Sequence, residues 1–149
     1  MKKLLLVFAA MVLCSSAFAQ IESHVKWAYA FKKINNKEGV VLLRATIDEG
    51  WHIYSTTLKA GGPIKTSFTF AKSPDYVLNG KVSEPKPVTK FEKSFGMNVT
   101  YFENTVTFQQ KVKLNAKKTT IKGKLEFMTC NDQKCLPPDD VDFAVAVAL

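Results

Sequence analysis

The sequence has 149 residues, of which 46% are hydrophobic, and a formal net charge of +8. This length suits one domain built around a single core. The lysines are scattered singly and are not massed in a run, which favours a solvated surface over a nucleic-acid patch. Beyond the N-terminal segment no apolar stretch is long enough to span a bilayer, so the composition argues against an integral membrane protein.

The N-terminal segment has the pattern of a secretory signal peptide. Lys2 and Lys3 form a basic region, and the apolar run at residues 4–13 is too short to span a bilayer comfortably. Residues 17–19 provide an A-x-A cleavage site. We therefore expect residues 1–19 to be removed, which leaves one domain of residues 20–149 with a net charge of +6 in an oxidising compartment.

Cys14 offers an alternative for this segment. A lipoprotein would be modified at this cysteine, but Leu13 occupies a position where a small residue is normally needed, so the lipoprotein ranks second. Cleavage after Ala19 removes Cys14 and leaves an even pair, Cys130 and Cys135.

Period-two alternation of apolar and polar residues predicts most of the strands. In chain order, the alternating stretches are 25–32, 41–48, 105–114, 121–128 and 142–149, and shorter stretches with strand composition lie at 51–55 and 66–70. Turn residues separate them at 35–39, 48–50, 61–63 and 115–118. The stretch 73–97 contains three prolines and has no clear period, so we expect a long loop-like insert that is functional or partly mobile.

The spacing of these elements indicates the fold class. No segment shows a 3.6-residue apolar stripe with caps. Seven to nine short strands at hairpin spacing predict an all-β domain, an immunoglobulin-like antiparallel β-sandwich. A closed barrel is the alternative architecture.

The two remaining cysteines flank a four-residue segment, Asn131 to Lys134, which has the length and composition of a hairpin loop. Across an antiparallel pair the Cα atoms of facing residues lie about 4.5 Å apart, within the range that a disulfide tolerates. The pair can therefore bond, and its role is either a structural staple, a redox centre or half of a metal site.

These three roles have unequal support from the residues. A six-residue ring removes only about 2 kcal/mol of unfolded-chain entropy, which makes a weak staple. The parity of the preceding strand places Cys130 on the face of Lys122 and Lys124, away from the core unless a bulge intervenes, and a near-surface disulfide suits exchange. Small exported domains nevertheless use staples often, so the residues alone leave the redox and structural roles open.

The other chemistries have little support. Structural zinc needs four ligands, and the only histidines, His24 and His52, have no ligand spacing to the cysteines or to each other. His52 is interpreted as a packed or hydrogen-bonded strand residue. No catalytic triad, nucleotide-binding loop or carboxylate pair stands out, so hydrolase chemistry is not supported. We expect no metal and no cofactor.

The sequence as a whole resembles a known family. Cys130 to Cys135, followed by Leu136-Pro137-Pro138, resembles the C-terminal hairpin of the N-terminal periplasmic domain of DsbD, the transmembrane thiol–disulfide interchange protein. Weaker matches lie upstream, at Trp51-His52-Ile53-Tyr54, Gly62-Pro63, Phe95-Gly96 and Val99-Thr100-Tyr101-Phe102. The resemblance covers essentially the whole of residues 20–149.

The resemblance implies a periplasmic, immunoglobulin-like domain that relays reducing equivalents, which would make it a thiol–disulfide oxidoreductase of the protein-disulfide reductase type. Its partners would be thioredoxin-like proteins and a membrane electron-delivering protein. Carried over by position, Cys135 forms the mixed disulfide with partners and Cys130 resolves it. A cap loop at residues 91–97 would shield the cysteines, with Phe95 as the first choice for the shield, Phe91 as the second, and Glu92 as the acidic residue near the cap.

The sequence departs from the family pattern in three ways. The better-studied members have one more residue between their cysteines, and an aromatic is usual where Ser94 stands. Known members also carry membrane and thioredoxin-like domains on the same chain, whereas this sequence ends at Leu149. We therefore expect a free-standing relay with separate partners or, alternatively, a domain that has lost the relay role. The alternative function is an exported β-sandwich binding module with a purely structural disulfide, for which Trp27, Trp51 and the tyrosines supply aromatic material.

Overall fold

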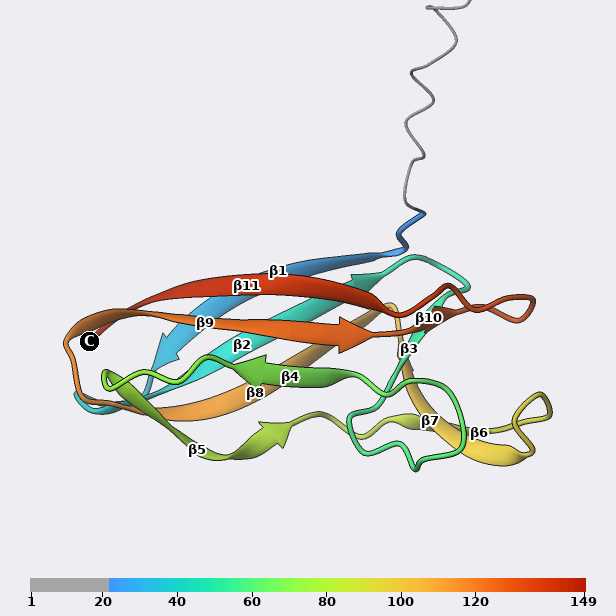
Figure 1. Cartoon of the computed structure of the whole chain (residues 1–149), viewed down its shortest axis with the longest axis horizontal. Coiled ribbons are helices and arrows are strands. Elements are labelled where there is room, and N and C mark those ends of the chain that lie inside the picture. The colour runs from blue at the N-terminus through green and yellow to red at the C-terminus, as the bar shows by residue number, and fades with distance from the viewer. Residues whose placement is uncertain (1–21) are drawn as a thin grey trace, which may run out of the picture.

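The computed structural model describes residues 22–149 as eleven β-strands in three antiparallel sheets (Figure 1). The strands are β1 (Val25–Lys33), β2 (Glu38–Ile47), β3 (His52–Tyr54), β4 (Ser67–Phe70), β5 (Tyr76–Ser83), β6 (Val88–Glu92), β7 (Met97–Glu103), β8 (Thr105–Leu114), β9 (Lys118–Phe127), β10 (Thr129–Cys130) and β11 (Asp139–Ala148). The expected signal peptide and Cys14 lie outside the described residues. Within residues 22–149, no helix has the length and apolarity needed to cross a membrane.

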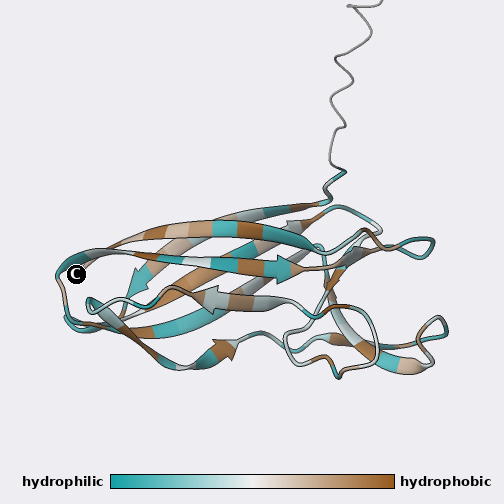
Figure 2. Ribbon diagram, viewed as in Figure 1, coloured by the Kyte–Doolittle hydropathy of each residue, from teal (hydrophilic) through white to brown (hydrophobic). Residues whose placement is uncertain are grey.

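Two of the sheets form the layers of an immunoglobulin-like β-sandwich, as predicted. One layer has the strand order β1-β2-β8-β5 and the other the order β11-β9-β4, and in Figure 1 the second layer lies in front of the first. Leu43 and Phe108 from one layer join Ile121 and Leu125 from the other in a single core, and all four are fully buried. Figure 2 shows the alternation of hydrophobic and hydrophilic residues along these strands that the sequence predicted.

The third sheet lies at one end of the sandwich and has the strand order β10-β3-β7-β6 (Figure 1). Buried residues alternate between the two faces of β3 and β7, so each of these two strands has one face toward the main core. Ile53 and Phe102 belong to that core, whereas Tyr54 and Tyr101, one residue away along their strands, belong to a second, smaller cluster. The outer face of this third sheet carries the cysteines.

The expectation of a loop-like insert at residues 73–97 is wrong. This stretch contains β5, which pairs with β8, and β6, which pairs with β7. Both are edge strands, and apart from Tyr76 few of their residues are buried, so neither face produced the alternation that reveals a half-buried strand. The prolines precede β5 or lie between β5 and β6, where the missing N–H costs no ladder hydrogen bond. These two strands, with β7 and the very short β10, bring the count above the expected seven to nine.

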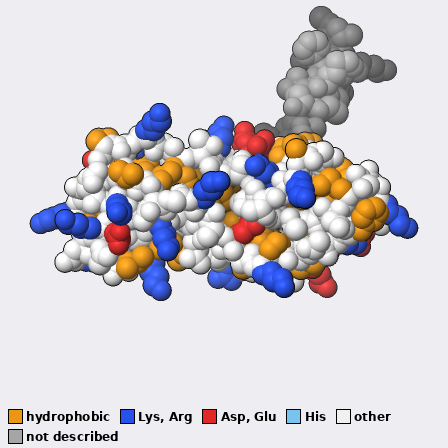
Figure 3. Space-filling view, turned by 90° about the horizontal axis from the view of Figure 1, so that it is seen from below, with side chains coloured by type: hydrophobic (Ala, Val, Ile, Leu, Met, Phe, Trp, Pro, Cys, Tyr) orange, Lys and Arg blue, Asp and Glu red, His pale blue; other side chains and the backbone are white. Residues whose placement is uncertain are grey.

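The charged side chains are spread over the surface. Figure 3 shows lysine and arginine side chains distributed across the visible face, with acidic and neutral side chains between them. This arrangement agrees with the solvated surface expected from the sequence.

Candidate redox site

The cysteines close a short hairpin that extends from the end of β10. The backbone N–H of Asn131 donates to the carbonyl of Lys134 at 2.9 Å, and the side-chain oxygen of Asn131 accepts the N–H groups of Gln133 and Lys134 at 2.9 and 2.8 Å. Asparagine satisfies turn amides in this way because its oxygen reaches its own backbone two residues on. Cys130 and Cys135 face each other across the hairpin, 4.0 Å apart at their Cα atoms, and form a disulfide. The predicted hairpin is confirmed.

The two halves of the disulfide differ in exposure. Cys130 is only 1% exposed, whereas Cys135 lies on the surface. The predicted strand parity holds, because Cys130 points away from the main core, but the expectation of a near-surface disulfide applies to Cys135 alone. Cys130 is covered by the second cluster, formed by Tyr54, Leu58, Val99 and Tyr101 with Met97 and Met128 packed against it.

Strand pairing at the sheet explains why Cys130 is buried. β10 pairs with β3 so that Cys130 lies opposite His52 and Thr129 lies opposite Ile53. Thr129 therefore faces the main core, and Cys130 faces the second cluster. Both residues of this two-residue strand are buried, which fixes one end of the hairpin to the body of the domain.

The turn between β6 and β7, residues 93–96, faces the cysteine hairpin across a cavity. Phe95 N–H donates to the Glu92 carbonyl, and Gly96 adopts a φ of 63°, a conformation that favours glycine. A cavity of about 170 Å³ separates this turn from the hairpin. Its lining comes from β3 and the end of β6 (His52, Tyr54, Glu92), the turn (Ser94, Phe95) and the cysteine hairpin (residues 130–135).

The structure separates the three residues expected in the cap. Phe95 is half-buried and lines the cavity together with Glu92 and both cysteines. Phe91 is 57% exposed and does not line it. The register explains the difference, because Glu92 lies opposite Met97 of the second cluster, and successive residues of a strand point to opposite faces.

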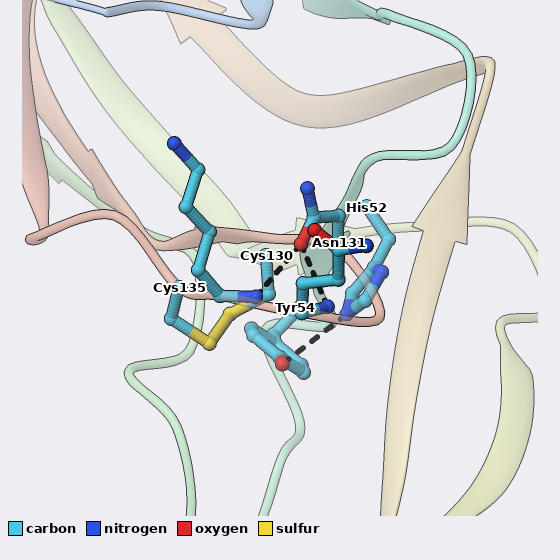
Figure 4. The surroundings of a disulfide bond; sticks show 7 residues. His52, Tyr54, Cys130, Asn131 and Cys135 are labelled. Carbon is cyan, nitrogen blue, oxygen red and sulfur yellow. Dashed lines mark hydrogen bonds between the residues drawn. A yellow bond between two sulfur atoms is a disulfide. The ribbon is translucent and has the colours of Figure 1, made fainter.

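His52 and Tyr54 are members of the site that the sequence reasoning did not assign to it. The ring nitrogen Nε2 of His52 lies 3.2 Å from the Tyr54 hydroxyl, and Figure 4 shows this pair beside the disulfide. Burial lowers the pKa of His52 and raises the pKa of Tyr54 to about 12, so both groups are neutral near pH 7. The interpretation of His52 as a hydrogen-bonded strand residue is confirmed. Its place beside Cys130 depends on the pairing of β3 with β10.

Charged side chains tie the hairpin to two other segments. Lys134 Nζ lies 2.9 Å from both carboxylate oxygens of Glu22 and 5.7 Å from the centre of the Trp51 ring. On the other side of the hairpin, Lys90 of β6 pairs with Asp132 at 3.4 Å. Lys134 and Asp132, the two charges nearest Cys135 in the sequence, are thus both engaged by other residues.

His24 completes the cluster around Lys134. Its ring stacks on Trp51 at 3.8 Å and forms 3.0 Å contacts to Glu22 and Asp48. The hydrogen bond that His24 makes to the Glu22 carboxylate raises the pKa of His24, and the hydrogen bonds that Glu22 accepts from His24 and Lys134 lower the pKa of Glu22. Among residues 22–149, no group of three or more metal-ligating side chains is arranged to hold a metal ion.

The fold of the chain is similar to that of several solved structures. The N-terminal periplasmic domain of ScsB from Proteus mirabilis matches with a TM-score of 0.60 and 18% identity over 85% of this chain, which spans 47% of that chain. The N-terminal domain of Neisseria meningitidis DsbD in the reduced form matches with a TM-score of 0.57 and 18% identity, covering 82% of this chain and 86% of that one. A complex between the DsbD and PilB N-terminal domains from the same organism matches with a TM-score of 0.55 and 18% identity, covering 87% and 88%.

These likenesses establish the fold. No curated protein sequence matches the chain. The family model described as "Thiol:disulfide interchange protein DsbD, N-terminal" matches residues 22–146, which include the whole cysteine hairpin. The chain therefore belongs to the family of DsbD N-terminal domains.

Proposed function

We propose that this domain relays reducing equivalents between thioredoxin-like proteins by thiol–disulfide exchange at Cys130 and Cys135. The observation that carries the proposal is the unequal exposure of the pair, with Cys135 on the surface and Cys130 buried. A thiolate must reach one of the two sulfur atoms to break the bond. Only Cys135 offers that approach, which supports the division of roles expected for the family.

The exchange proceeds in two steps. A partner thiolate attacks the Cys135 sulfur, the disulfide breaks, and its electron pair leaves on the Cys130 sulfur. The second thiol of the same partner then attacks the partner sulfur of the mixed disulfide. This releases the domain with both cysteines reduced and the partner with its own disulfide. The reduced domain delivers the two electrons in the reverse sense, with Cys135 attacking a substrate disulfide and Cys130 resolving the intermediate.

Relatives support the place and the partners of this chemistry. The ScsB domain is described as periplasmic, which agrees with export by a signal peptide at residues 1–19 and supports a periplasmic location. The DsbD domain of Neisseria meningitidis forms a complex with the N-terminal domain of PilB, which supports a protein partner. A membrane electron-delivering protein would reduce the domain, and the exchange requires no cofactor.

The turn at residues 93–96 acts as the cap in this proposal. Phe95 would shield the disulfide from solvent, because it lines the same cavity as both cysteines, and Glu92 lies beside it. Phe91 is the weaker choice, since it is exposed and outside that cavity. A partner would displace the turn as it docks over Cys135.

Single-cysteine variants test the relay. A reduced thioredoxin-like protein should reduce the wild-type disulfide within seconds to minutes, and Cys130→Ser should trap a mixed disulfide with it through Cys135. Cys135→Ser is the matched control and should trap little, because Cys130 is buried. Separation by non-reducing electrophoresis and mass spectrometry reads both results. Failure of thioredoxin-like proteins and small thiols alike to reduce the folded domain would refute the relay.

A further inference from the structure

The outer face of the third sheet carries a row of chemically active side chains. Cys135 faces Cys130 across the hairpin, Cys130 lies opposite His52 on β3, and His52 lies opposite Glu103 on β7. Residues directly opposite in antiparallel strands share a face and have Cβ atoms about 5 Å apart. The register therefore orders a disulfide, an imidazole and a carboxylate along one line across the sheet.

The imidazole in this row is half-buried and held in place. Its Nε2 atom contacts the Tyr54 hydroxyl at 3.2 Å, and its ring packs 4.8 Å from the ring of Tyr101. It lines the cavity that also contains both cysteines, Glu92 and Phe95. At about 30 Å³ per molecule, a cavity of about 170 Å³ has room for several waters, which would connect a cysteine sulfur to the imidazole.

The charged groups around the imidazole are mostly acidic. Glu103 faces it from β7, Glu92 and Lys90 from β6, and Asp132 from the cysteine hairpin. The three carboxylates favour the protonated ring, whereas Lys90 and burial oppose it, and burial is the largest effect. The ring is therefore neutral near pH 7, and its carboxylate neighbours favour the gain of a proton.

The thiol of the buried Cys130 must lose its proton to act as a nucleophile, and its surroundings make this harder than it is for the exposed Cys135. Cys130 is 1% exposed and packs among Tyr54, Val99 and Tyr101. A thiolate is costly in such surroundings, so the reduced Cys130 is a thiol, and a thiol is a poor nucleophile. The Cys130 sulfur has little contact with bulk water, so resolution of a mixed disulfide is favoured by a base that lines the cavity.

We propose that His52 accepts the proton of the Cys130 thiol when that sulfur resolves a mixed disulfide on Cys135. The Cys130–Cys135 bond forms as the bond from Cys135 to the partner sulfur breaks. The partner leaves as a thiolate with the electron pair, and the proton of Cys130 ends on the imidazole. In the reverse reaction the imidazolium returns this proton to the Cys130 sulfur, which leaves as a thiol. This inference rests on the proposed function and adds a base to its resolution step.

Oxidation of the reduced domain by excess oxidised glutathione tests the proposal. At concentrations where mixed-disulfide formation is not limiting, stopped-flow or acid-quench measurements report the resolution step. For the wild type, its rate should rise with pH as the imidazole loses its proton. In His52→Gln the rate near pH 7 should fall roughly 10²-fold, the lower range for general-base catalysis, and the imidazole step should vanish from the pH profile.

Two controls isolate the role of His52. His24→Gln removes the other histidine of the chain, which stacks on Trp51 outside the cavity, and should leave the resolution rate and its pH profile unchanged. Cys130→Ser reports the first step alone, which His52→Gln should not slow. An unchanged pH profile in a folded His52→Gln variant would overturn the inference and leave the relay intact, whereas absence of exchange in the wild type would overturn the relay itself.

Discussion

At the residue scale, two identical side chains, the imidazoles of the two histidines, have pKa values shifted in opposite directions by their surroundings. His24 is held by Glu22 and Asp48, whose hydrogen bonds favour its protonated form. His52 is half-buried, and loss of water around it favours the neutral form. Their effects on stability therefore have opposite signs.

The pKa values of the two histidines should separate on either side of 6.5. Protonation of His24 stabilises the fold, so its contribution is full below pH 6.5 and disappears as the pH rises through its raised pKa. Protonation of His52 destabilises the fold as the pH falls toward its lowered pKa. An NMR titration of the imidazole protons, assigned with His24→Gln and His52→Gln, measures both values. A pKa of His52 above that of His24 would contradict the assigned environments.

At the scale of elements, one carboxylate in the connection between β5 and β6 attaches the β6–β7 hairpin to the rest of the domain. Glu84 accepts a 2.9 Å hydrogen bond from the backbone N–H of Thr56 and a second bond from the hydroxyl of Ser55, which is fully buried. Both donors follow β3 in the chain. Glu84 thus attaches the start of β6 to the strand that carries His52 and Tyr54, and sets the position of the hairpin relative to the disulfide.

Removal of this carboxylate should destabilise the attachment of the β6–β7 hairpin. Glu84→Ala leaves the backbone N–H of Thr56 without its acceptor and leaves the buried Ser55 hydroxyl with only the Thr57 hydroxyl at 2.8 Å, which should cost about 1–3 kcal/mol in the free energy of unfolding. Urea unfolding measures that loss. Relative to the wild type, the substitution should speed hydrogen exchange at the β6 amides more than at the β2 amides. Glu49→Ala removes an exposed carboxylate and serves as the control, with an expected change within about 0.5 kcal/mol. Equal effects of the two substitutions would show that Glu84 does not anchor the hairpin.

Strand prediction succeeded where burial is one-sided. Val41, Leu43 and Ala45 alternate with exposed or half-exposed residues because one face of β2 meets the core. β5 and β6 were missed because they are edges with little burial on either face, so Val77 and Leu78 are exposed side by side. Periodicity records burial, and it does not record hydrogen bonding with a neighbouring strand.

The cysteine hairpin and its disulfide were predicted from the sequence, but their surroundings were predicted only in part. The spacing and loop composition were sufficient to predict the cysteine hairpin. The burial of Cys130 and the presence of His52 beside it depend on the pairing of β10 with β3, two short strands far apart in the chain. The partner of Lys134 is Glu22, near the other end of the domain. No local pattern contains such long-range pairings.

At the scale of the whole molecule, the disulfide contributes little to holding the sandwich together. The main core lies between the two layers, and the cysteines belong to the smaller cluster at one end. The ring that the bond closes spans only positions 130–135. Loop-closure entropy for such a ring is about 2 kcal/mol, a modest part of the stability of a domain this size.

Reduction should therefore leave the domain folded. The midpoint of thermal unfolding should fall by roughly 5–10 °C in excess reductant, because about 2 kcal/mol is lost. The double variant Cys130→Ser/Cys135→Ser should melt at about the same temperature with and without reductant. Circular dichroism or calorimetry follows both transitions. Unfolding of the wild type on reduction would identify the bond as a structural staple and favour the binding-module alternative.

The segment that follows Cys135, residues 136–138, restricts the motion of the backbone next to this cysteine. Leu136 donates its N–H to the Thr129 carbonyl at 2.9 Å, and Pro137 and Pro138 then have no N–H to donate before β11 begins at Asp139. Proline also fixes its own φ, so this segment is stiff without being part of a sheet. Cys135 therefore lies between the turn at residues 131–134 and a stiff segment bonded to β10. We expect the backbone after Cys135 to keep its position when the disulfide opens, so that the change falls mainly on the turn.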